Sequence, residues 1–165
     1  MIRRLFSLAT LFVVSAAPLA GQADPHRQVA ERVLRSTPLI DGHNDLPWLI
    51  RERAGGDVEA YDLRRRTPGH TDLERLRAGL LGGQFWSVYI PGEIRDSGYA
   101  RVQLEQIELA RRLIAKYPEA FQPATTADGM RRAFAAGRIG SVLGMEGVTP
   151  SRIPSVPSGP TSRWG

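Results

Sequence analysis

The sequence predicts an α/β fold in which parallel strands alternate with helices. Short runs rich in β-branched and aromatic residues alternate with longer segments whose apolar residues recur every three and four positions. Gly and Pro bound these segments, and no internal repeat is evident. Strands that alternate with helices in this way are typical of βαβ units, so we expect a parallel sheet.

The first half of the chain has two expected helices and one expected strand. Residues 26–35 suit a short helix with Val29 and Val33 on one face, ended by Pro38. A short buried strand is expected over 39–45, and residues 54–70 have loop composition. Residues 71–74 (Thr-Asp-Leu-Glu) form a capping box that begins a helix ended by Gly79.

The second half repeats the alternation. Residues 84–90 are aromatic and β-branched and stop at Pro91, as expected of a strand. The apolar spacing from Tyr99 to Tyr117 predicts a long amphipathic helix. A further helix is expected over 126–136, ended by Gly137, and a third strand over 139–145.

Composition excludes several classes of protein. Hydrophobic residues make up 42% and charged residues 24%, as in globular proteins rather than disordered or collagen-like chains. The absence of cysteine excludes a disulfide scaffold, a thiolate metal site and a cysteine nucleophile. The formal net charge of +5 is small and dispersed, so we expect neither nucleic-acid nor membrane-surface binding.

Residues 1–23 have the pattern of a signal peptide. Arg3 and Arg4 precede an apolar run over 5–17, and small residues follow, with 21–23 as the expected cleavage site and Ala20 as the alternative. The apolar run is shorter than the roughly 20 residues that span a bilayer. We expect cleavage, no transmembrane span in the mature chain, and a secreted or periplasmic location; a retained N-terminal anchor is the alternative.

Three side chains are candidate metal ligands. His43 and Asp45 lie two residues apart at the end of the first strand, which places both on one side of it. Glu146 follows the third strand, where a carboxylate needs a partner or a metal. The carboxyl ends of parallel strands meet at one edge, so the three are expected to converge, and an imidazole with carboxylates suits zinc.

Each candidate also has a simpler interpretation. His43 and Asp45 alone are more often a local hydrogen-bonded pair, and Glu146 is as well explained by a salt bridge to an arginine. His70 and Asp72 repeat the two-residue spacing, but Asp72 is expected to serve the helix terminus. His26 is expected to be exposed near the mature N-terminus.

Three blocks of the sequence carry recognisable motifs. They are residues 38–48 (PLIDGHNDLPW), residues 71–77 (TDLERLR) with 82–89 (GGQFWSVY), and residues 144–147 (GMEG). In this order they resemble the opening, second and third blocks of the membrane dipeptidase (renal dipeptidase) family of metallopeptidases. The resemblance covers about residues 37–147.

The resemblance implies the N-terminal portion of a TIM (β/α)8 barrel of the metal-dependent hydrolase type, and hydrolysis of dipeptides. By that resemblance His43 and Asp45 bind the first of two zinc ions and Glu146 bridges both, with a bridging solvent molecule as nucleophile. The full-length family also implies a homodimer. The family's remaining zinc-binding histidines, its substrate-binding histidine and its catalytic aspartate lie further along than this chain extends.

The expected barrel is incomplete. Such a barrel takes about 250 residues and eight strands, whereas three strands are expected over 24–147. We therefore expect a truncated, inactive form that binds zinc weakly and hydrolyses no dipeptide. A non-enzymatic secreted α/β binding module is the alternative, and a cooperative thermal melt would indicate that module rather than a fragment.

Residues 148–165 form a Pro/Ser-rich tail with the composition of a disordered segment. Its serines nevertheless follow a helical spacing of four, three and four, at Ser151, Ser155, Ser158 and Ser162. If they use TCN codons, a frame that starts one base earlier encodes an apolar residue at each. We therefore expect that one base was lost near the codons for residues 146–148, and resequencing would test this.

Overall fold

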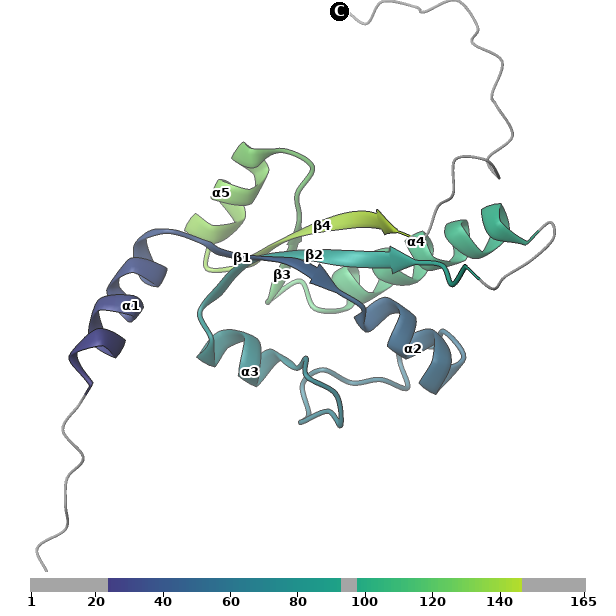
Figure 1. The fold of residues 1–165 in the computed structure, drawn as a ribbon, viewed down its shortest axis with the longest axis horizontal. Helices are drawn as coiled ribbons and strands as arrows, with labels where there is room; N and C mark the ends of the chain where they lie inside the picture. The colour runs from purple at the N-terminus through teal and green to yellow at the C-terminus, as the bar shows by residue number, and fades with distance from the viewer. Residues whose placement is uncertain (1–23, 93–97, 147–165) are drawn as a thin grey trace, which may run out of the picture.

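The computed structural model describes residues 24–92 and 98–146 (Figure 1). The expected signal peptide and the tail over 148–165 lie outside this part. The described residues form a four-stranded parallel sheet in the order β1-β2-β4-β3. The strands are β1 (Leu39–Asn44), β2 (Leu81–Tyr89), β3 (Phe121–Pro123) and β4 (Ile139–Glu146).

The α/β class, the parallel pairing and the three expected strands are confirmed. The sheet is open and has one strand more than the sequence predicted. β3 has three residues, too few for an alternating pattern to identify it.

Five helices accompany the sheet in the described residues: α1 (Pro25–Ser36), α2 (Leu46–Ala54), α3 (Leu73–Ala78), α4 (Tyr99–Lys116) and α5 (Ala127–Ala135). Four were expected. α2 was not, although Leu46 and Ile50 lie one helical turn apart and are both buried. Pro47 lies in its first turn, where the missing backbone N–H costs no hydrogen bond. No described helix is both long enough and apolar enough to span a membrane.

One apolar cluster joins α2, α3 and α4 to the sheet. Trp86 of β2 is its largest fully buried side chain and contacts Phe121 edge-on at a centroid distance of 5.2 Å. The buried Tyr117 hydroxyl accepts a hydrogen bond from the backbone N–H of Leu63 (2.8 Å), which attaches the loop before α3 to the end of α4. α5 lies on the opposite side of the sheet from α2 and α3 (Figure 1).

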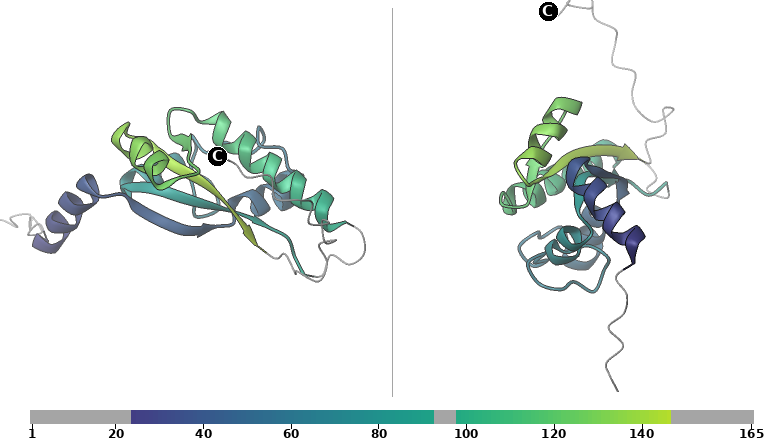
Figure 2. Two further views of the ribbon diagram at one scale, coloured as in Figure 1. Left: turned by 90° about the horizontal axis from the view of Figure 1, so that it is seen from above. Right: turned by 90° about the vertical axis from the view of Figure 1, so that its left-hand side faces the viewer.

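β1 is exposed, and the prediction of a buried strand is wrong. Leu39 and Ile40 are 43% and 47% exposed. β1 is the edge of the sheet, so in the described structure only β2 pairs with it. α1, whose Val33 is also exposed, extends away from the sheet instead of covering β1 (Figure 1, Figure 2). β4 is likewise buried only at its start.

Asp72, rather than Thr71, caps α3. Its carboxylate accepts from the backbone N–H of Arg75 (2.9 Å), from the Arg75 guanidinium (2.8 Å) and from the backbone N–H of Thr67 (3.3 Å). The side chain is almost completely buried. Burial alone would raise the pKa of Asp72, but the hydrogen bonds from Arg75 and Thr67 outweigh it and hold that pKa below its usual value.

We expect Asp72 to make the stability of the protein acid-sensitive. A carboxyl whose pKa is lowered by folding stabilises the fold above its unfolded pKa of about 3.9, and that contribution is lost as the pH falls through the folded value. Urea denaturation of Asp72→Asn should show lower stability at pH 7 and a smaller further loss toward pH 3 than the parent chain. The exposed Asp128→Asn variant is the control, and a loss in acid equal to that of the parent would contradict the assignment.

Gly82 allows close contact between three elements. A Cβ at this position would lie 2.7 Å from Cβ of Pro38 and 2.9 Å from a ring carbon of Phe134. These atoms belong to the segment before β1 and to α5, and Pro38 cannot rotate away because its ring is part of the backbone.

Gly82→Ala should therefore destabilise the fold by about 1–3 kcal/mol through overpacking. Gly92→Ala is the matched control, since nothing lies within 4 Å of the corresponding Cβ position. Urea denaturation of both variants measures the difference. Equal stabilities would show that Pro38 and Phe134 do not approach Gly82 this closely.

Candidate metal centre

The three predicted ligands come together at the carboxyl end of the sheet. His43 lies near the end of β1, Asp45 directly follows that strand, and Glu146 is the last residue of β4. β2 lies between the two strands, so the side chains meet across its end. Because the three strands are parallel, positions 43 and 146 lie at the same end of the sheet.

His43 stands between the two carboxylates. Its Nε2 is 3.1 Å from Oδ1 of Asp45 and 3.2 Å from Oε2 of Glu146. One ligand atom from each side chain lies within 4.8 Å of the others. This spacing is short enough for one ion to contact all three, and one imidazole with two carboxylates is a donor set that suits zinc.

In the described structure Glu146 does not form the salt bridge to an arginine that was the simpler interpretation of this residue. Its side chain is 46% exposed. Among the described residues its charged partner is His43, not an arginine. Ser87 of β2 donates a hydrogen bond to Oε2 of Glu146 (2.9 Å), which holds the carboxylate over the end of the central strand.

A partly buried network of side-chain amides fixes the β1–α2 junction. Nδ2 of Asn44 donates to Oε1 of Gln84 (3.2 Å) and to the hydroxyl of Thr71 (3.1 Å). Gln84 is fully buried in β2, and its Nε2 donates to the carbonyl oxygens of Asp41 (3.4 Å) and Phe85 (3.1 Å). The backbone is therefore held on both sides of His43.

The same network leaves the carboxylate of Asp45 free of the helix-capping hydrogen bond, so it can face the other two ligands. Asp45 occupies the N-cap position of α2 but makes no capping hydrogen bond. Oδ1 of Asn44 accepts the backbone N–H of Leu46 instead (3.0 Å), a first-turn donor that needs a partner. The Asp45 carboxylate consequently faces His43 rather than the helix.

Asn44 and Gln84 were not among the residues that the sequence indicated for the site. Gln84 carried a usable signal, because an amide inside an aromatic and β-branched strand needs hydrogen-bond partners when buried. Asn44 could not be paired with it until the neighbour of β1 was known.

The other histidines lie outside the ligand cluster. His70 does not pair with Asp72, which serves α3 as expected. It is exposed and lines an open cavity of about 560 Å³ that also contacts His43, Asp45 and Arg53. His26 is exposed on α1, as predicted.

Comparison with known proteins gives one family. The model of the family described as membrane dipeptidase (peptidase family M19) matches residues 27–151. "Dipeptidase 3" of Mus musculus is 44% identical over 126 residues, which are 76% of this chain and 25% of the mouse protein. "Dipeptidase 3" of Rattus norvegicus matches with the same identity and coverage. The chain thus spans about a quarter of the length of these curated relatives.

Two solved structures share the fold. A metallo peptidase from Rhodobacter sphaeroides, liganded with a phosphinate mimic of the dipeptide L-Ala-D-Ala, matches with a TM-score of 0.59 and 23% identity. That match covers 67% of this chain and 38% of the other. The dipeptidase AC, also of family M19, matches with a TM-score of 0.53 and 24% identity over 67% of this chain and 37% of its own. At these identities the two structures support the fold, that of a partial barrel.

We expect Asn44→Ala to lower the free energy of unfolding by about 1–3 kcal/mol, because it leaves the buried Oε1 of Gln84 and the N–H of Leu46 with one partner fewer. Gln28→Ala is the control, since Gln28 is exposed on α1. Chemical denaturation of both variants measures the difference. A loss no greater than that of Gln28→Ala would show that the amide network does not hold the junction.

Proposed function

We propose that this chain, which belongs to the membrane dipeptidase family (peptidase family M19), forms part of a zinc-dependent enzyme that hydrolyses dipeptides. The observation that carries the proposal is the meeting of His43, Asp45 and Glu146 at the carboxyl end of a parallel sheet. Sites of α/β barrels are built at this end.

The three side chains have distinct roles in this proposal. His43 and Asp45 would hold the first ion, and Glu146 would help to hold both this ion and a second. Both recorded contacts of the Glu146 carboxylate use Oε2, so within the described structure Oε1 is open to another ion. Bound zinc supplies a Lewis acid for the peptide carbonyl and lowers the pKa of a bound water.

The open cavity beside the ligands fits a small peptide. Its volume of about 560 Å³ lies within the usual range of small-molecule sites. Leu46 and Leu49 give it apolar surface, whereas Arg53 and His70 are polar and exposed. This composition suits a substrate with charged ends and a side chain between them.

We also propose that the protein is exported through the signal expected over 1–23 and that the family's homodimer applies to it. The alternative of a non-enzymatic secreted binding module has no observation in its favour among the described residues.

The 165-residue polypeptide by itself should bind zinc only in the micromolar range or more weakly. The described residues supply three ligands, whereas stable zinc sites have about four. Calorimetric titration should show this weak binding lost in His43→Ala and kept in His70→Ala. Nanomolar zinc affinity that depends on His43 would overturn the expectation.

The same polypeptide should hydrolyse no dipeptide in a preparation free of host peptidases. Turnover that both a chelator and Glu146→Gln abolish would refute this expectation and show that the three ligands suffice.

A chimera tests the family activity itself. The segment over 38–146 would replace the aligned part of the Rhodobacter sphaeroides metallo peptidase, and correct folding would be checked by circular dichroism. We expect dipeptide hydrolysis that His43→Ala, Asp45→Asn or Glu146→Gln lowers at least a hundredfold, and that His70→Ala retains. A folded chimera whose dipeptide hydrolysis is unchanged by all three ligand substitutions would contradict the proposal.

A further inference from the structure

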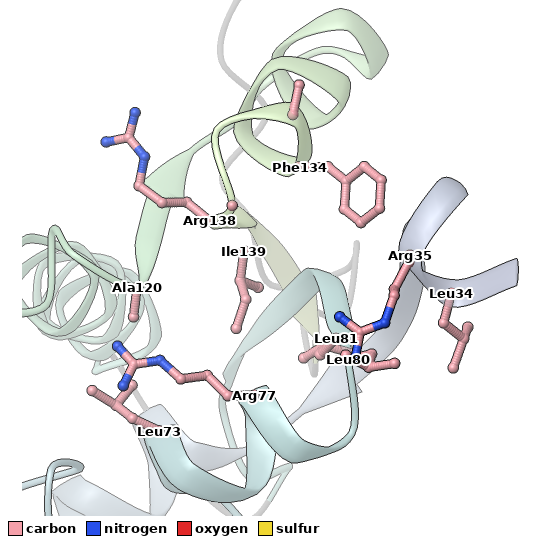
Figure 3. A pocket seen from close by; sticks show the side chains of 12 residues that line it. Leu34, Arg35, Leu73, Arg77, Leu80, Leu81, Ala120, Phe134, Arg138 and Ile139 are labelled. Atoms are coloured by element: carbon pink, nitrogen blue, oxygen red, sulfur yellow. The ribbon is translucent and has the colours of Figure 1, made fainter. Parts of the chain in front are cut away.

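A second cavity lies at the opposite end of the sheet (Figure 3). It has a volume of about 520 Å³ and is open to solvent on one side. Leu81 and Ile139, the first residues of β2 and β4, line it together with residues of α1, α3 and α5. It therefore shares no residue with the metal centre.

Three arginines from different elements line this cavity: Arg35 of α1, Arg77 of α3 and Arg138 just before β4. Within the described part of the chain, none of the three side chains has an ion pair or a hydrogen bond. Glu119 interacts with Arg77 through space, but its carboxylate contacts Arg64 at 2.8 Å. Among the described residues no acidic side chain lines the cavity, so the charges on its wall are all positive.

The surface between the arginines is apolar. Figure 3 shows Ile139 and Ala120 between Arg77 and Arg138, with Leu80 and Leu81 beside Arg35. Eight apolar side chains line the cavity: Leu34, Leu73, Leu80, Leu81, Ala120, Phe134, Ala135 and Ile139. An inorganic anion would leave this surface in contact with water, whereas an apolar body would cover it.

Leu80 adds an independent observation. Its backbone has φ of +54°, and in the described residues it is the one non-glycine position with positive φ. This conformation is costly for leucine, and asparagine or glycine would adopt it more easily. Strain of this kind tends to occur at functional sites, and here it accompanies an apolar side chain at the cavity.

We propose that this cavity binds a small anionic amphiphile: a carboxylate or phosphate group held by the arginines, attached to an apolar body that covers the leucines and Phe134. A guanidinium binds either anion through paired N–H donors. The size of the cavity suits one small molecule rather than a folded partner.

The test uses the full chain with decanoate as the probe, below its micelle concentration. Decyltrimethylammonium has the same tail with the opposite charge, and inorganic phosphate has the charge without the tail. We expect saturable calorimetric binding of decanoate that is at least about tenfold tighter than binding of either comparison compound.

Variants separate the head-group site from the apolar site. Arg77→Gln and Arg138→Gln should each weaken decanoate binding about tenfold, whereas Arg132→Gln, an exposed arginine of α5 outside the cavity, should not. Leu80→Asn removes the apolar side chain and introduces a residue that adopts positive φ more easily than leucine. This variant should therefore weaken decanoate binding while the fold is retained. Far-ultraviolet circular dichroism verifies folding in each case.

Three results would overturn the proposal. The first is no decanoate binding to the full chain, which would mean that a protein segment or solvent fills the cavity. The second is equal binding of decanoate and decyltrimethylammonium. The third is decanoate binding that Arg77→Gln, Arg138→Gln and Leu80→Asn leave unchanged relative to Arg132→Gln.

Discussion

The structure depends on the position of β2 between two parallel neighbours. β2 pairs with β1 on one side and with β4 on the other. It thereby joins two strands, β1 and β4, that are about 100 residues apart in the chain. One face of β2 serves both the core and the site. Trp86 supplies the largest buried side chain of the core, and Gln84, two residues earlier on the same face, satisfies the hydrogen bonds of the β1–α2 junction. A shift of this strand by one residue would turn this face away from the core and disturb the alignment of the ligands.

The site follows from that alignment and from one exchange of hydrogen bonds. Asn44 takes the helix-capping contact that its neighbour would otherwise make, and Asp45 is left facing His43. Ser87, on the same central strand as Gln84, donates a hydrogen bond to the carboxylate of Glu146. Side chains of β2 thus orient Asn44 of β1 on one side of the strand and Glu146 of β4 on the other. Exposure of all three ligand side chains keeps the cluster accessible to an ion and to substrate.

Much of this could be predicted from the sequence. The pleat of a strand places His43 and Asp45 together, and the common direction of parallel strands brings Glu146 to the same edge, so local rules were sufficient. Rules of this kind failed where neighbours decide the outcome. Leu39 and Ile40 are as apolar as buried strand residues, but an edge strand with one partner leaves them exposed. β3 is too short to show a period, and the bond between Asn44 and Gln84 depends on which strands are adjacent.

The most direct test of the central claim is anomalous diffraction from a crystal of the protein soaked in zinc, because it locates the ion without relying on activity. The account predicts a peak within about 2.0–2.2 Å of Nε2 of His43 and of carboxylate oxygens of Asp45 and Glu146. The peak should vanish in Glu146→Gln and persist in His70→Ala. A peak at His70 instead, or none near Glu146 at saturating zinc, would contradict it.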